Sequence, residues 1–177
     1  MMLRVLLCVA VCSSSMTTQS SGTPDLRAQR AAMQKLGFLV GKWSGEAQVF
    51  PSAGETLRLE WIENAEYKLD GLILEVEANG RNKADNTVVR QALGIVSYDD
   101  SVGAYRMRTY NDGRYLETDL KVLDAGNGFT WGFKIGDIRI SSVLEINDRG
   151  DWTEVHHITI GYQPTRKLME VRVTRLK

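Results

Sequence analysis

The chain has 177 residues, and its 22 basic residues are balanced by 22 acidic ones. This length fits one domain that can bury a continuous core without a metal or a disulfide. A surface without net charge exerts no long-range attraction on nucleic acid, so we expect no nucleic-acid partner.

The first 22 residues predict a signal peptide followed by a polar linker. Met1 to Arg4 is a short positive segment, Val5 to Cys12 is apolar, and the residues that follow are small and polar. The apolar run is far shorter than the roughly 20 residues of a membrane-spanning helix, so we expect no transmembrane span. The leader therefore predicts an exported protein, periplasmic or secreted.

Both cysteines, Cys8 and Cys12, lie in this leader, and the mature domain has no thiol. Disulfides, cysteine-ligated zinc and a cysteine nucleophile are thereby excluded from the domain. The segment Val9 to Cys12 also resembles a bacterial lipoprotein signal, in which Cys12 is lipidated and becomes the new N-terminus. Lipid anchoring through Cys12 and plain signal cleavage both stay open.

Residues 23–177 predict a single domain that opens with a helix at about residues 24–40. Thr23 is the expected cap, and Pro24 is expected at the first helical position. Apolar residues follow near-helical spacing from Leu26 onward, and Gly37 or Gly41 is expected to end the helix. We expect this helix to cover one end of the structure that follows.

From Trp43 onward the apolar pattern changes to a period of two, which is typical of half-buried strands. Ten strand-like segments are separated by turn residues, at approximately 43–50, 55–67, 71–81, 87–98, 103–110, 114–124, 128–135, 138–147, 151–161 and 167–176. Short hairpins place each strand beside the next, and closing the sheet removes its exposed edges. The sequence thus predicts an all-β, ten-stranded, antiparallel up-and-down barrel.

Charged residues at alternate positions mark the outward face, so the inward face can be identified by difference. It is largely apolar, and the side chains we expect to line an apolar pocket are Trp61, Tyr105, Met107, Trp131 and Phe133. Glu63 continues the inward face from Trp61 and is expected at the solvated rim. In the fourth strand, Gln91, Leu93 and Ile95 compete with Ala92, Gly94 and Val96 for the interior. Whether the barrel is hollow or filled by its own side chains stays open.

The last strand predicts a closing contact between the two ends of the sheet. Arg175 falls at the inner-face end of this strand. A guanidinium at this place can stack on the indole of Trp43 and donate to backbone carbonyls, which would join the first and last strands.

The motif Gly41-x-Trp43, the preceding helix, ten strands and the late Arg175 together resemble the calycin superfamily, which includes lipocalins and fatty-acid-binding proteins. More narrowly, the chain resembles exported bacterial lipocalin-like proteins of unknown function. The resemblance implies a barrel that binds a small apolar or amphipathic molecule. The stretch from Gly41 to Glu46 also resembles nitrobindin, whose haem iron is held by a histidine near the C-terminus. The predicted last strand has no histidine, so we expect no haem and no other cofactor.

The two histidines, His156 and His157, are neighbours on a strand and therefore face opposite sides, which prevents them from sharing one metal ion. We expect one of them inside the barrel, with His156 as the candidate anchor for a polar ligand head. Two other functions are weighed beside small-molecule binding. One is a solidly packed envelope protein that acts through its surface, and the other is an enzyme that uses His156 or His157 with Glu154. The sequence leaves the oligomeric state undetermined.

Overall fold

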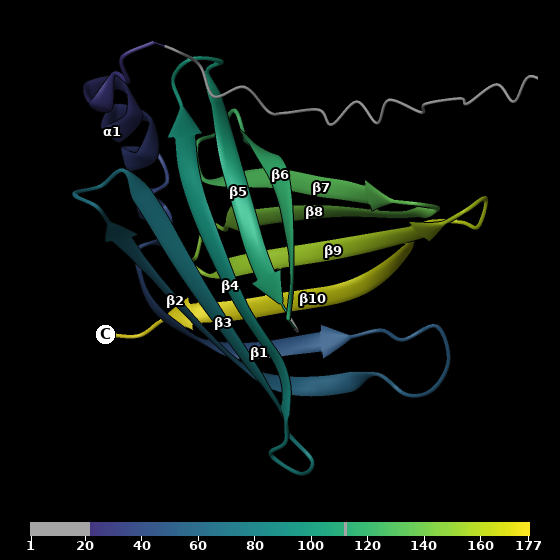
Figure 1. The fold of residues 1–177 in the computed structure, drawn as a ribbon. Coiled ribbons are helices and arrows are strands. Elements are labelled where there is room, and N and C mark those ends of the chain that lie inside the picture. Colours follow the sequence, from purple (N-terminus) through teal and green to yellow (C-terminus); the bar gives the residue numbers. More distant parts are fainter. Residues whose placement is uncertain (1–21, 112) are drawn as a thin grey trace, which may run out of the picture.

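The computed structural model of the protein describes residues 22–111 and 113–177. Residues 1–21 of the predicted leader, with Cys8 and Cys12, lie outside the described residues. Ten antiparallel strands follow one short helix and form a closed barrel in which each strand pairs with the next and the first pairs with the last (Figure 1). The predicted up-and-down barrel is therefore confirmed.

The elements follow the predicted order closely. They are α1 (Leu26–Gln34), a 3-10 turn (Gly37–Leu39), β1 (Gly41–Val49), β2 (Leu57–Lys68), β3 (Ile73–Asn82), β4 (Val88–Asp99), β5 (Ala104–Asn111), β6 (Arg114–Val122), β7 (Gly128–Ile135), β8 (Ile138–Ile146), β9 (Trp152–Ile160) and β10 (Arg166–Arg175). In β4, Val96 is buried and Ala92 and Gly94 pair with the inward-facing Ala78 and Val76, which decides the register that the sequence left open.

The helix is shorter than predicted, and its cap differs. Asp25, rather than Thr23, is the N-cap, and its carboxylate accepts hydrogen bonds from the backbone N–H groups of Arg27 and Ala28. A side chain that accepts from two otherwise unpaired N–H groups makes the stronger cap. Gly37 starts the separate 3-10 turn, so the predicted interruption is present there.

Polar contacts hold α1 over one end of the barrel (Figure 1). The hydroxyls of Tyr67 and Tyr105 donate to the carbonyl oxygens of Met33 and Ala32, at 2.7 and 2.8 Å. Arg30 forms an ion pair with Asp70 in the β2–β3 turn, at 2.8 Å. The two hydroxyls satisfy carbonyl groups near the helix C-terminus. Since Tyr67 lies on β2 and Tyr105 on β5, these bonds fix the helix to two different strands.

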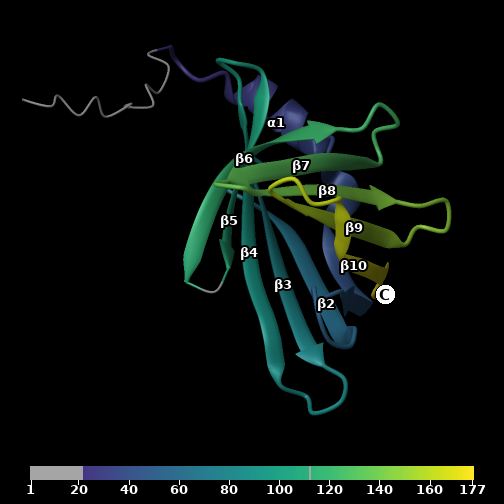
Figure 2. The same cartoon turned by 90° about the vertical axis from the view of Figure 1, so that its right-hand side faces the viewer.

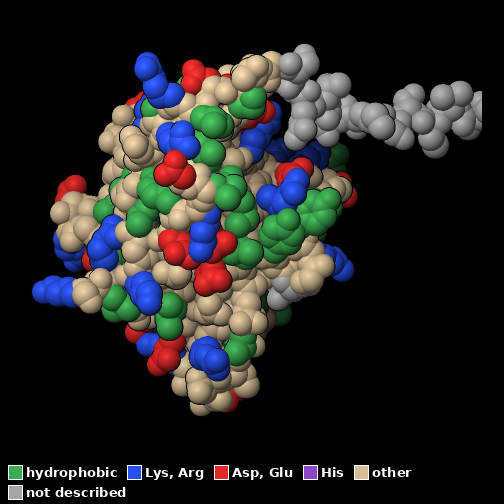
Figure 3. Space-filling model, turned by 60° about the vertical axis from the view of Figure 1, so that its left-hand side comes forward, with side chains coloured by type: hydrophobic (Ala, Val, Ile, Leu, Met, Phe, Trp, Pro, Cys, Tyr) green, Lys and Arg blue, Asp and Glu red, His purple; other side chains and the backbone are tan. Residues whose placement is uncertain are grey.

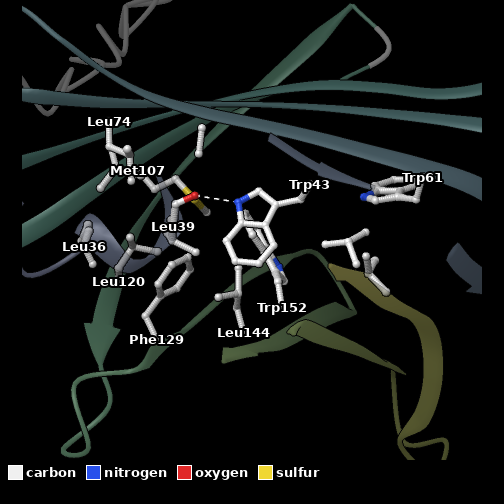
Figure 4. Packing of buried hydrophobic residues seen from close by; sticks show 14 of the residues in the cluster. Leu36, Leu39, Trp43, Trp61, Leu74, Met107, Leu120, Phe129, Leu144 and Trp152 are labelled. Carbon is white, nitrogen blue, oxygen red and sulfur yellow. Dashed lines mark hydrogen bonds between the residues drawn. The ribbon is translucent and has the colours of Figure 1, made fainter. Parts of the chain in front are cut away.

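Part of the apolar core fills the end of the barrel that α1 covers. Met33, Leu36 and Leu39 pack against inward-facing side chains of the strands. Figure 4 shows Trp43 at the centre of this group, with its indole N–H donating to the carbonyl of Leu39 at 2.8 Å. Trp152 meets the ring of Trp43 edge to face, with 5.5 Å between ring centroids. Trp61 lies apart from this group in the same view.

One seam of the barrel is weakly paired. Strands β6 and β7 share only three register pairs, Leu120–Val122 with Phe129–Trp131, whereas β8 and β9 share nine. Beyond Trp131 the two strands are joined by a side chain, because the Thr118 hydroxyl donates to the carbonyl of Gly132 at 2.6 Å. Figure 2 shows β6 and β7 running in different directions away from α1.

Opposite charges alternate over the outer surface. Figure 3 shows acidic and basic side chains interspersed on one face. Cross-strand ion pairs such as Arg106–Asp119, at 2.7 Å, neutralise neighbouring positions on the outside of β5 and β6. No helix within the described ranges has the length and hydropathy to cross a membrane.

Candidate functional site

Three rows of inward-facing side chains cross β7, β8 and β9 toward the end of the barrel away from α1. From the interior to the rim they are Trp131–Ser142–His156, Phe133–Ile140–Ile158 and Ile135–Ile138–Ile160. The first row is polar and the other two are apolar. The rim row stays in water, with Ile135, Ile138 and Ile160 exposed by 62%, 41% and 38%. An amphipathic surface therefore leads from the rim to a polar interior.

Both ring nitrogens of His156 have a polar neighbour, and one of them forms a hydrogen bond. Its Nδ1 lies 2.7 Å from the hydroxyl of Ser142, and its Nε2 lies 3.6 Å from Oε1 of Glu154. Burial lowers the pKa of His156 most strongly, and the nearby Glu154 partly offsets that effect. The neutral imidazole is thus fixed in orientation inside the barrel. His157 lies on the opposite face of β9, as expected from strand alternation.

Two carboxylates in the interior accept hydrogen bonds from tryptophan indoles. The Trp61 indole N–H donates to Oε1 of Glu63 at 2.6 Å, and that of Trp131 donates to Oε1 of Glu154 at 3.2 Å. The ring of Trp131 also meets His156 edge to face, with centroids 5.7 Å apart. The indoles therefore act as polar groups of the site as well as apolar walls.

Glu63 corrects the expectation of a solvated rim position. Its side chain is buried, with 3% exposure, because β2 carries it inward from Trp61 at a level that the neighbouring strands cover. Its Oε2 has no hydrogen-bond partner among the described residues. Burial, with a further contribution from Glu154, raises the pKa of Glu63 well above its usual range, although the Trp61 hydrogen bond opposes the shift.

Arg90 is the basic group of the site. It lies on β4 opposite Gly80, on the inward face, and is half-buried. Its charge acts on both Glu63 and His156. Among the described residues it forms no ion pair within 4.0 Å.

Gly80 allows Trp61 to lie close against β3. A Cβ at this position would fall 2.5 Å from Cζ3 of the Trp61 ring. An indole ring cannot bend away from such a contact, so the missing side chain at Gly80 sets the position of Trp61 and of the Glu63 that it contacts.

The structure brings together four of the predicted pocket residues and separates two. Trp61, Trp131, Phe133 and His156 belong to the rows and contacts described above. Tyr105 binds the helix backbone through its hydroxyl. Met107 is buried on the side of Leu39 and Leu74, away from Trp61 (Figure 4).

Sequence reasoning missed Ser142 and Arg90 as site residues. Ser142 lies directly opposite His156 in the β8–β9 register, so a correct strand alignment would have paired them. Arg90 continues the alternation of Val96, Gly94 and Ala92 on β4, so it was missed because the sequence left the register of this strand open.

The expected contact between the ends of the sheet is present. The guanidinium carbon of Arg175 lies 4.1 Å from the Trp43 ring centroid, and Nη2 donates to the carbonyl of Phe38 at 2.7 Å. Nη1 donates to the carbonyl of Val40. Gly41 has a φ of 135°, and a Cβ there would lie 2.4 Å from Arg175 Nη1. The glycine is therefore required both by its backbone angle and by the arginine.

Two surface hollows lie outside the barrel interior. One, of about 340 Å³, lies beside α1 and is lined by Arg30, Gln34, Tyr67, Asp70 and Gly71. The other, of about 410 Å³, lies along β3, β4 and β5 near Asn79, Gln91 and Tyr110. Neither contains the two carboxylates or His156. Within the described residues, no group of three or more His, Cys, Asp or Glu side chains is arranged to hold a metal ion.

One solved structure shows where this barrel belongs among known folds. The crystal structure of Rv2717c from M. tuberculosis superposes with a TM-score of 0.63 over 82% of this chain and 98% of that one, at 12% sequence identity. No family model matches the chain, and no curated protein matches it either. At this identity the likeness shows the fold alone, a ten-stranded antiparallel barrel.

Proposed function

We propose that the barrel binds a small amphipathic molecule through its open end, with the polar head inside and the apolar part toward the rim. The observation that carries this proposal is the order of the three rows: polar side chains lie inside, and two apolar rows lead outward to an exposed rim. Pockets for small molecules combine apolar walls with a few placed polar groups, and this arrangement has both.

Three further features support the proposal. The helix-covered half is filled by Met33, Leu36 and Leu39 together with side chains of the strands, so we expect a ligand in the other half. Inward-facing residues of that other half, such as Thr109 and Phe133, are only half-buried. The β6–β7 seam, with three register pairs, lies beside Trp131 and is the place where we expect the rim to open. Because β10 has no histidine, we expect this binding to operate without haem.

We also propose that the binding takes place outside the cytoplasm. The support is the leader alone: a short positive segment, an apolar run and a small polar stretch within residues 1–22. Release into the periplasm or medium and anchoring through a lipidated Cys12 are both compatible with this support.

Native mass spectrometry tests the binding proposal. The mature protein is purified from its natural source, and its mass is measured before and after denaturing extraction. We expect an added mass of a few hundred daltons that disappears on denaturation. A clean mass of the chain alone, in repeated gentle preparations, would favour a barrel that acts through its outer surface.

A second candidate function is hydrolysis. Ser142, His156 and Glu154 form a continuous chain of polar contacts, 2.7 and 3.6 Å long. In serine hydrolases such a chain activates the hydroxyl as a nucleophile. Ser142 itself is buried, with 1% exposure, and its contact orients His156. Hydrolysis of p-nitrophenyl butyrate that is lost in both Ser142→Ala and His156→Ala would support this second candidate.

A further inference from the structure

One buried polar atom without a partner in the described part of the barrel interior is an acceptor that belongs to Glu63. Oε2 of Glu63 is buried and has no hydrogen-bond partner among the described residues, while Oε1 accepts from the Trp61 indole at 2.6 Å. A buried polar atom without a partner costs free energy, so a ligand group that donates to it regains that cost on binding.

The charged groups around Glu63 leave an excess of negative charge. Glu154 on β9 repels it, Arg90 on β4 attracts it, and burial disfavours the charged form of His156. The facing residues on β1 and β3, Trp43 and Ala78, carry no charge. Two carboxylates therefore face one arginine. The charges of the site balance only when Glu63 keeps its proton or a cation binds beside it.

The two indole donors beside the carboxylates are already occupied. The indole N–H groups of Trp61 and Trp131 point to Glu63 and Glu154. An anionic head would be attracted by the half-buried Arg90 but would lie beside two carboxylates, which repel it. A head that donates hydrogen bonds and carries positive charge meets the free acceptor instead.

We propose that the amphipathic ligand carries a protonated amine head, and that Glu63 is its counter-ion inside the barrel. This inference rests on the proposed function and names the chemical class of the ligand. On binding, the neutral carboxyl of Glu63 releases its proton to solvent, and the carboxylate accepts hydrogen bonds from the ammonium group. The alkyl part lies along Phe133, Ile140 and Ile158 toward the exposed rim.

Three probes with the same alkyl chain test the head group: dodecylamine, dodecanol and dodecanoate. Each is titrated into the purified protein below its critical micelle concentration at pH 7.5, and binding is followed by tryptophan fluorescence, since Trp61 and Trp131 lie at the site. We expect dodecylamine to bind at least about tenfold more tightly than the other two, because it alone makes a charge-assisted contact.

The Glu63→Gln variant gives the decisive comparison, with Glu60→Gln as the matched control. Glu60 lies on the same strand but is exposed on the outer face. We expect Glu63→Gln to bind dodecylamine no more tightly than dodecanol, while Glu60→Gln keeps the full preference. Retained dodecanol binding by Glu63→Gln shows that the barrel is intact.

Calorimetry adds an independent readout. When dodecylamine binds, about one proton per ligand should be released, so the binding enthalpy should differ between phosphate and Tris buffers. Dodecanol should show no such difference. Equal or tighter binding of dodecanoate, or an amine preference that survives in Glu63→Gln, would overturn the inference while leaving the barrel a binding protein. Failure of all three probes to bind would overturn the proposed function and the inference together.

Discussion

Glu63 and His156 are both shifted toward their neutral forms, yet they change stability with pH in opposite directions. The folded protein binds more protons at Glu63 than the unfolded chain does between the ordinary value of 4.5 and the raised pKa. The free energy of unfolding therefore falls as pH rises through that window. At His156 the folded protein binds fewer protons below the ordinary value of 6.5, so stability falls as pH drops below it.

Replacing Glu63 by Gln should remove the alkaline part of this dependence. We expect the melting temperature of the wild-type protein to fall between pH 7 and pH 9, where His156 no longer contributes, and that of Glu63→Gln to fall less. Differential scanning calorimetry at several pH values measures the difference. Parallel curves for the two proteins would show that Glu63 is charged in the folded state throughout that range.

The sequence predicted which face of the sheet a side chain occupies, but it predicted less well how deeply that side chain is buried. Strand alternation correctly placed Glu63 on the same face as Trp61, but the expected solvated position was wrong. Strand alternation shows on which face of the sheet a side chain lies. It does not show how far the neighbouring strands extend beyond that residue, which determines whether the side chain is covered. That distance depends on strand tilt and stagger around the closed barrel, which are properties of the whole sheet.

At the scale of elements, the β6–β7 seam is the least supported part of the barrel. Three register pairs and the Thr118 hydroxyl join these strands, so the amides that point into the seam beyond Trp131 lack a strand partner. Local stability follows such differences in pairing. The seam is therefore the place where the barrel opens with the least loss of backbone hydrogen bonds.

Hydrogen exchange should show this weakness directly. We expect the seam-facing amides of β6 and β7 beyond Trp131 to exchange at least about tenfold faster than those between β8 and β9. Thr118→Val, which removes the hydroxyl at nearly constant volume, should increase exchange there and lower the melting temperature by about 2–4 °C for a loss of ~1 kcal/mol. Uniform protection across all strand pairs would contradict the assignment of the seam.

The Arg175 contact stabilises the arrangement of the strands, because it joins β10 to β1 and to the residues before β1. We expect Arg175→Ala to lower the melting temperature by about 3–8 °C, since it removes a cation–π contact and two hydrogen bonds to carbonyls. The melting temperature of Arg175→Lys should lie between those of Arg175→Ala and the wild-type protein, because lysine keeps the charge but lacks the planar guanidinium group. Arg172→Ala, on the exposed face of the same strand, serves as the control in the same calorimetric experiment.

At the scale of the molecule, the architecture followed from local patterns. The period of two, the turn residues and the need to remove sheet edges were enough to predict ten strands and closure. The helix was predicted too long because apolar residues at helical spacing continue through Leu36 and Leu39, where the chain has already changed to a 3-10 turn. The polar interior was predicted only in part: His156 was expected inside, whereas Ser142 and Arg90 were missed because their positions depend on strand register.

Export is a prediction about the whole molecule. When the full chain is expressed in a Gram-negative host, we expect the mature protein in the periplasm or the membrane fraction, with an intact mass that lacks the leader. A lipid-anchored form would add the mass of a diacylglyceryl group and would lose palmitate labelling in Cys12→Ser. Full-length protein confined to the cytoplasm would contradict export.

The pairing of β1 with β10 has a consequence for how the chain reaches its native state. The register joins residues as distant as Trp43 and Arg175, so closure requires a long-range search that no local hairpin can replace. Until these strands meet, the nine-hairpin sheet has two open edges that can pair with other chains. We expect slow, concentration-sensitive refolding, in which the joining of the first and last strands is the step that competes with aggregation.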